Sequence, residues 1–121
     1  MKNQKTRITN FIINEYNRKP EYLWEKFPNH FIFRHQDNKK WFALIANVAK
    51  EKVGINEKGN IDILNIKLNP FEVNIFKTQQ GFFPAYHMNK QKWLTARLDD
   101  SVPDEILEEL INNSFNETKN S

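Results

Sequence analysis

Five short apolar segments, set between two stretches of helical periodicity, constrain this chain more than any other feature. The clearest is residues 61–68, in which Leu64 and Ile66 fall on one side and Asn65 and Lys67 on the other. Successive side chains of a strand point to opposite faces, so this alternation is typical of a strand with two different surroundings. Because a strand is not stable alone, the chain is expected to build a sheet.

The other four segments also have strand-like composition and are separated by residues typical of turns. Gln36-Asp37-Asn38-Lys39 and Asn56-Glu57-Lys58-Gly59 divide the first three segments into hairpins. The four segments are residues 31–33, 41–45, 82–87 and 93–98. Together with residues 61–68 they predict an antiparallel sheet of about five strands.

Helical periodicity occurs near both ends of the chain. The first apolar stripe, within residues 4–17 and ending before Pro20, consists of Ile8, Phe11, Ile12 and Tyr16. A second helix is expected to start around Ser101, Pro103 and Asp104, where small polar and acidic residues surround a proline. Its apolar stripe consists of Ile106, Leu107, Leu110, Ile111 and Phe115.

A short middle helix is predicted after residue 68. Asn69 can cap it, Pro70 suits its first position, and Glu72 stands three residues after the cap, as in a capping box. Gly81 is expected to close this segment. The predicted architecture is α+β, with the sheet flanked by N-terminal, short middle and C-terminal helices.

Chain length indicates one domain, residues 1–121, with a core over about residues 4–116. Ten phenylalanines and three tryptophans supply large apolar side chains for that core. The absence of cysteine excludes disulfides and thiolate metal sites, so packing must stabilise the fold. This composition also fits a reducing compartment.

No segment resembles a secretory signal or a membrane span. Residues 1–5 are charged but precede no apolar run of signal length, and the apolar stretch Phe42–Ala49 is interrupted by Asn47. A cytoplasmic protein that does not enter the membrane is therefore expected.

The net charge of +3 conceals an uneven distribution along the chain. Residues 1–60 hold twelve Lys and Arg against six Asp and Glu, whereas residues 61–121 hold six against nine. Residues 99–117 contain seven acidic residues and no basic one. One basic face and one acidic helix are therefore predicted.

The segment from Pro84 to Trp93 carries a recognisable pattern. Its residues His87-x-Asn89-Lys90-x-x-Trp93 resemble the signature of the bacterial MmcQ/YjbR family. Three further segments resemble that family in the same order: Lys40-Trp41-Phe42-Ala43, Leu64-Asn65-Ile66-Lys67-Leu68-Asn69-Pro70, and Asp99-Asp100-Ser101-Val102-Pro103-Asp104. The likeness runs from about residue 27 to about residue 115.

This resemblance implies an antiparallel sheet flanked by helices, similar to the frataxin-like (CyaY-like) fold and of double-wing form. It also implies DNA binding, which is the family's usual label. The family-motif positions are His87, Asn89, Lys90, Trp93 and Lys67. The charged passage 50–59 departs from the family pattern between two strands, where one wing is expected.

No pattern in the sequence indicates an enzyme. Nucleophilic catalysis needs a serine beside a base, but Ser101, Ser114 and Ser121 lie near helix ends or in the tail. The three glycines form neither a phosphate-binding loop nor a dinucleotide fingerprint, so no cofactor is expected. An active site assembled from His87, Asn89 and Lys90 is therefore less favoured than a role in binding nucleic acid or in binding a protein partner.

Metal binding is not predicted either, because the three histidines match no standard zinc spacing. For His87 two interpretations stay open: a base or ligand, or a residue that holds a turn through backbone hydrogen bonds. Four carboxylates at the start of the C-terminal helix form either a weak site for hard cations or a solvated helix face: Asp104, Glu105, Glu108 and Glu109. The solvated face is favoured, since the first carboxylates also stabilise the helix N-terminus.

The leading hypothesis is a non-enzymatic nucleic-acid-binding module that uses basic turns. Its candidate residues are Arg34, Lys39, Lys40, Lys90, Lys92 and Trp93. Lysines at hairpin tips can contact phosphates, and Trp41 or Trp93 could stack on a base. Alternatively, the lysines maintain solubility and both tryptophans belong to the core. About four phosphate contacts predict weak, salt-sensitive binding.

The rival hypothesis is a protein-interaction module. The acidic helix from Pro103 to Phe115, or an exposed face of the sheet, would dock a protein partner.

Overall fold

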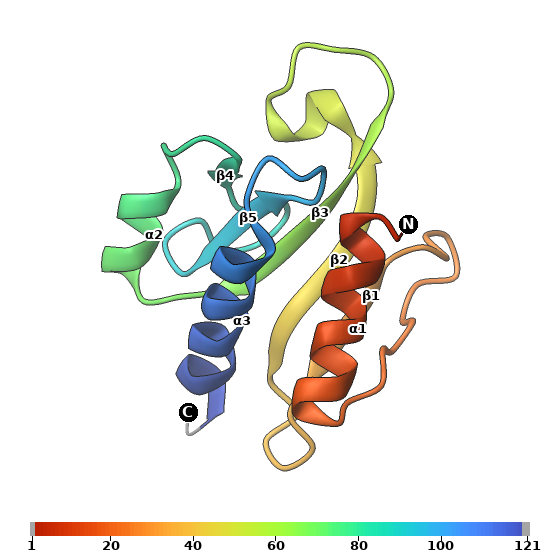
Figure 1. Ribbon diagram of the computed structural model, residues 1–121, viewed down its shortest axis with the longest axis vertical. Helices are drawn as coiled ribbons and strands as arrows, with labels where there is room; N and C mark the ends of the chain where they lie inside the picture. The colour runs from red at the N-terminus through yellow and green to blue at the C-terminus, as the bar shows by residue number, and fades with distance from the viewer. Residues whose placement is uncertain (1, 120–121) are drawn as a thin grey trace.

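The structure, a computed structural model, describes residues 2–119 and contains one antiparallel sheet with three α-helices (Figure 1). The strand order is β1-β2-β3-β5-β4. The elements are α1 (Gln4–Tyr16), β1 (Phe31–Arg34), β2 (Trp41–Ala49), the 3-10 helix η1 (Lys50–Val53), β3 (Asn60–Lys67), α2 (Pro70–Phe76), β4 (Phe82–Pro84), β5 (Trp93–Arg97) and α3 (Asp104–Lys119). This confirms the predicted α+β architecture of five strands and three helices.

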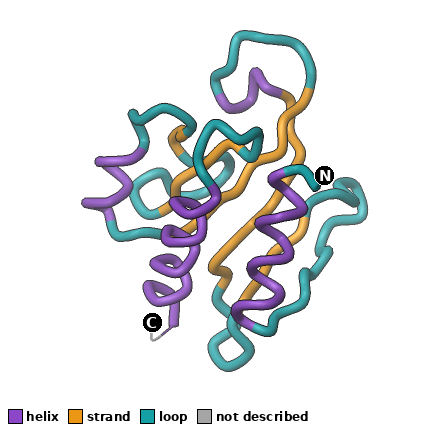
Figure 2. The backbone as a smooth tube through the Cα atoms, in the orientation of Figure 1, coloured by secondary structure: helices purple, strands orange, loops and turns teal. Residues whose placement is uncertain are grey.

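Two layers make up the domain. Helices α1 and α3 lie across the same face of the sheet, while α2 lies to one side of it (Figures 1 and 2). We call the face under α1 and α3 the helical face; it carries Ile45 and Leu64, which are partners across β2 and β3. We call the opposite face the open face; it carries Leu44 and Asn65, the adjacent pair. No helix in the described residues is long and apolar enough to cross a membrane.

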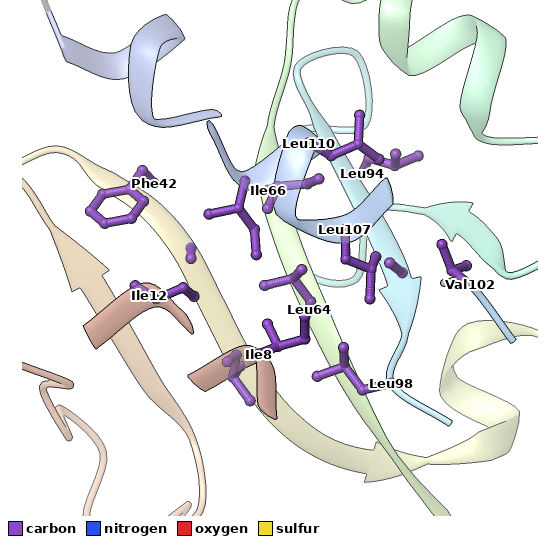
Figure 3. Close-up of a cluster of buried hydrophobic side chains, with 14 of the residues drawn as sticks. Ile8, Ile12, Phe42, Leu64, Ile66, Leu94, Leu98, Val102, Leu107 and Leu110 are labelled. Atoms are coloured by element: carbon purple, nitrogen blue, oxygen red, sulfur yellow. The ribbon is translucent and has the colours of Figure 1, made fainter. Parts of the chain in front are cut away.

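The main hydrophobic core lies between the helical face and the two long helices (Figure 3). Helix α1 contributes Ile8 and Ile12, and α3 contributes Leu107 and Leu110. These side chains meet the strand residues that point toward the helices, and Ile8, Ile12 and Leu107 are completely buried. The apolar residues of the alternating strand pattern and those of the two helical patterns therefore pack together in one core.

The predicted caps are confirmed at the middle helix. The Asn69 side chain accepts a hydrogen bond of 2.9 Å from the backbone N–H of Glu72 and donates one of 2.9 Å to its carboxylate. Helix α2 itself ends at Phe76, and turns continue to Gly81, which closes the segment directly before β4. Gly81 has φ of +93°, and a Cβ there would collide with Val102.

Some predicted boundaries need correction. The strand expected over residues 82–87 ends at Pro84, because proline has no N–H to continue the ladder. Strand β2, by contrast, extends to Ala49, and α3 extends to Lys119. Ile106, placed in the apolar stripe of α3, is 40% exposed.

The edges of the sheet are short or covered. Along β1, the backbone of Glu21 exchanges two hydrogen bonds of 2.9 and 3.0 Å with Ile32. At the other edge, β4 is only three residues long and ends in Pro84.

The charged passage 50–59 is packed against the sheet. Val53 and Ile55 contact a small cluster on the open face that includes Val48, Ile61 and Ile63. The β2–β3 hairpin extends beyond its neighbouring strands (Figure 1), and the apolar residues of its connection anchor that connection to the open face.

Candidate nucleic-acid interface

The turn between β1 and β2 is fixed by Asn38. The side-chain amide of Asn38 donates to the carbonyl oxygens of Thr118 and Lys119, at 2.8 and 3.1 Å, and its Oδ1 accepts from the N–H of Lys40 at 2.9 Å. Lys39 stands at the tip with φ of 64°, in the left-handed region. The last turn of α3 thus holds the exposed Lys39 in place.

Arg34 differs from the lysines because it already has a carboxylate partner. Its Nε and Nη2 donate to the two carboxylate oxygens of Glu21 at 3.0 and 2.7 Å. A bidentate pair of this kind satisfies both charges. Arg34 therefore contributes less free positive charge than its sequence position suggested.

A hollow of about 590 Å³ lies beside this pair, between the end of α1 and the start of the β1–β2 turn. Four cationic side chains line it, with Glu21 as the one carboxylate. We call it the basic hollow; its cations are Arg18, Lys19, Arg34 and Lys39. Only Arg34 and Lys39 had been predicted.

His35 also lines the basic hollow but does not add to its positive charge. Its Nε2 donates to the carbonyl oxygen of Phe115 at 3.1 Å. Burial lowers the pKa of His35 below its ordinary value, and the positive charges of Arg18 and Lys119 act in the same direction. The ring is therefore neutral near pH 7.

The family signature forms the connection between β4 and β5. The Oδ1 of Asn89 accepts from the N–H of Gln91 at 2.9 Å, and its backbone carbonyl accepts from the N–H of Trp93 at 2.9 Å. The Nζ of Lys90 donates to the carbonyl oxygen of Ala85 at 2.8 Å. Asn89 and Lys90 thus shape their own loop.

A buried polar network fixes this connection against the open face. The Thr95 hydroxyl donates to Oδ1 of Asn65, and the Asn65 amide donates to the carbonyl oxygen of Tyr86 at 2.9 Å. The N–H of Tyr86 donates back to the Thr95 hydroxyl at 2.8 Å. Asn65 and Thr95 have no exposed surface, so these bonds are shielded from water.

His87 follows this network directly. It is exposed, has φ of 56°, and its ring centroid lies 4.1 Å from that of Tyr86. The unusual backbone conformation places it at the bend of the connection.

The remaining predicted residues are dispersed. Trp93 is buried, with 9% of its surface exposed, which leaves little ring area for stacking on a base. Lys92 is exposed and Lys40 is half-buried. For Lys67, the backbone N–H donates to the Ser114 hydroxyl at 2.8 Å.

The register shows how the two basic connections are related. Arg34 pairs with Trp41 and Pro84 with Leu94, and the intervening pairs place both connections at the same end of the sheet. Three strand spacings of about 4.8 Å separate them, or roughly 14 Å. The predicted lysines therefore form two groups rather than one.

The acidic segment of residues 99–117, which includes most of α3, is less acidic than its sequence suggests. Asp100 and Asp104 both pair with Arg7 of α1, and Asp99 pairs with Arg97. Three of the seven carboxylates of residues 99–117 are thereby compensated by arginines from outside α3. Within residues 2–119, no group of three His, Asp or Glu side chains is placed to hold a metal ion.

The pairing of Arg7 with Asp104 makes stability depend on pH. The guanidinium holds the pKa of Asp104 below its ordinary value, so the stabilisation is present above the unfolded pKa, about 3.9. It is lost as pH falls through the lower folded pKa. We therefore expect Asp104→Asn to destabilise the protein at pH 7 and to destabilise it less at about pH 3, which is below the unfolded pKa.

Urea unfolding followed by circular dichroism at both pH values measures this effect. Glu109→Gln, at an exposed position of the same helix, is the control and should change neither midpoint. An Asp104→Asn effect of equal size at both pH values would contradict the assignment.

These features define a class of small α+β domain, in which an antiparallel sheet carries two helices on one face and a hydrogen-bonded signature connection on the other. The YjbR family model matches residues 16–117. The chain belongs to the YjbR family, as the resemblance in its signature had implied.

Relatives of known sequence or structure agree with this assignment. The uncharacterised protein YyaQ of Bacillus subtilis is 39% identical over 112 residues, which cover 93% of this chain and 95% of YyaQ. A Pseudomonas syringae protein of known crystal structure is 37% identical and superposes with a TM-score of 0.92, covering 94% of this chain and 97% of that one. A Deinococcus radiodurans protein with a DUF419 domain shares the fold. It is 21% identical and superposes with a TM-score of 0.64, covering 86% of this chain and 70% of that one.

Proposed function

We propose that this protein is a non-catalytic module that binds nucleic acid through the basic hollow. The observation that carries the proposal is the gathering of four cations around one hollow that contains a single carboxylate. The cations come from α1's C-terminal side, the β1 edge and the β1–β2 turn, which meet only in the folded chain. Phosphate oxygens are the ligands that such a cluster attracts.

Three of these cations are available to a ligand. Within the described residues, Arg18, Lys19 and Lys39 form no ion pair, whereas Arg34 is paired with Glu21. Lys39 is carried on a turn that α3 holds in place, so it can act as the tip of a wing. Three phosphate contacts correspond to weak binding, with dissociation constants of roughly 10⁻⁴ to 10⁻⁶ M.

The non-catalytic role is supported by the signature connection. An active site built on His87, Asn89 and Lys90 would need the Asn89 and Lys90 side chains to reach a substrate. Both instead bond to the backbone of their own loop.

Reversing Arg18, Lys19 and Lys39 to glutamate together is expected to abolish binding of fluorescein-labelled DNA. In wild type, the affinity for single strands should fall with salt at a log–log slope of about −2, since each phosphate contact contributes about 0.7. Fluorescence anisotropy with single- and double-stranded probes at low and near-physiological salt measures both quantities.

The matched control reverses Lys2, Lys58 and Lys77, which lie outside the basic hollow. Each triple variant has the same net charge, so only the position of the charges differs between them. Retained binding by a folded hollow variant, or equal losses in both variants, would overturn the proposal. Circular dichroism establishes that each variant is folded.

A second candidate function is docking of a protein partner, favoured by exposed apolar residues on α2. Phe71 and Ile75 are 74% and 43% exposed and stand four residues apart on one side of the helix. If wild type binds neither DNA probe at low salt, this function becomes the preferred one, and Phe71 is the first position to substitute in a partner search.

A further inference from the structure

A second hollow, of about 340 Å³, lies on the open face of the sheet. The loop before β1 supplies Trp24 and His30 to one wall, and the β4–β5 connection supplies His87 and Met88 to the other. Trp41 of β2 also lines it. We call this the aromatic hollow. Phe27, from the same loop as Trp24, also lines it, and neither residue was among those predicted to bind nucleic acid.

We propose that the aromatic hollow binds a nucleobase of a single-stranded nucleic acid. The proposal rests on the proposed function, because the phosphates attached to that base would be held by the cations described above. It adds a site at which the nucleic-acid strand is recognised through a base rather than through the charge of its phosphates. A base paired and stacked in a duplex is not available to enter such a hollow.

The walls are suited to a flat ring. Trp24 and Trp41 meet edge to face with centroids 5.7 Å apart, and Trp24 lies 6.2 Å from His30 in a similar arrangement. Indole and imidazole rings attract another π-system through stacking, and every nucleobase has such a face. A volume of about 340 Å³ is at the lower end of the range of small-ligand pockets.

Positive charge flanks the hollow on both sides. On one side, Trp41 of the aromatic hollow pairs in register with Arg34 of the basic hollow, whereas Ile13 of the basic hollow belongs to α1, on the helical side of the sheet. On the far side, His87 is shared with a third hollow of about 430 Å³, lined by Lys52 and Lys90. A ring that carries phosphates on both sides complements this arrangement better than an uncharged aromatic compound would.

His30 offers the ring a polar contact. Burial lowers the pKa of His30, so its imidazole is neutral near pH 7 and has one nitrogen that accepts a hydrogen bond. Its Nδ1 is the only buried side-chain nitrogen or oxygen in the described residues without a hydrogen-bond partner. Rotation of the imidazole toward a ligand would therefore break no hydrogen bond at Nδ1.

Two oligomers of equal length and charge separate base recognition from phosphate binding. One is an oligothymidylate, and the other is an abasic strand with the same phosphates. By anisotropy at low salt, wild type should bind the oligothymidylate about tenfold more tightly than the abasic strand, the size expected for one stacked base. Trp24→Ala should remove this difference, and Trp24→Phe should retain most of it.

The control substitution is Tyr22→Ala, which removes a 61% exposed ring of the same loop that does not line the hollow. It should leave the preference unchanged. If both oligomers bind wild type equally and with the same salt dependence, the base site is overturned while the proposed function stands. If neither binds, both proposals fail.

Tryptophan fluorescence provides a readout that needs no substitution. Trp24 and Trp41 line the hollow, and Trp93 is buried elsewhere on the sheet. Quenching by the oligothymidylate but not by the abasic strand is expected. Equal quenching by both would contradict stacking.

Discussion

Replacing Phe42 by alanine is expected to lower the free energy of unfolding by about 3 to 5 kcal/mol. Phe42 is completely buried, and its ring centroid lies 5.4 Å from that of Tyr16 and 5.0 Å from that of Phe115. The backbone carbonyl of Phe42 also accepts a hydrogen bond of 2.6 Å from the Ser114 hydroxyl. One ring thus joins α1 and α3 to the sheet, and its removal leaves a cavity that all three elements border.

Phe71→Ala is the matched control, because it deletes the same atoms at a position that is 74% exposed. A surface substitution of this kind should change stability by no more than about 0.5 kcal/mol. Chemical denaturation monitored by circular dichroism compares the two variants. A Phe42→Ala loss near that of Phe71→Ala would mean that the aromatic cluster does not support the fold in this way.

Replacing Asn65 by leucine is expected to cost about 2 to 4 kcal/mol, because it leaves the Tyr86 carbonyl and the Thr95 hydroxyl without their buried partner. Each unsatisfied buried group costs roughly 1 to 3 kcal/mol. The signature connection should also lose protection in amide hydrogen exchange, since the network is what ties it to the open face. The double variant with Thr95→Val should lose less than the sum of the single losses.

Asn47→Leu is the control for this network. Asn47 is half-buried and bonds to the side chains of Asp62 and Asn60 near the other end of the sheet. Its replacement should cost about 1 kcal/mol and leave hydrogen exchange of residues 86–92 unchanged. Equal losses of protection in both variants would argue against a specific role for Asn65.

Much of the fold could be predicted because its signals are local. The alternation of apolar and polar residues through Leu64 and Ile66 indicates which side of β3 is covered by helices. The capping residue Asn69 forms the contacts that its position relative to Glu72 requires. Such features depend on residues only a few positions away in the sequence, so they can be predicted from the sequence alone.

The candidate site was only partly predictable because its residues come from distant segments. Arg18 and Lys19 follow α1 in the sequence, and nothing local connects them with Lys39. The tandem of basic residues before Pro20 was the available signal. Trp24 lies in a loop without periodicity, and only the folding of that loop beside β1 places it next to Trp41.

The two edge strands of the sheet, β1 and β4, affect whether the protein aggregates at high concentration. An unpaired strand edge is a template on which a second copy can extend the sheet and begin a fibril. Here the backbone of Glu21 occupies part of the outer side of β1, while β4 is too short and too interrupted by Pro84 to align a partner strand. Association of native copies by sheet extension is therefore disfavoured at both edges.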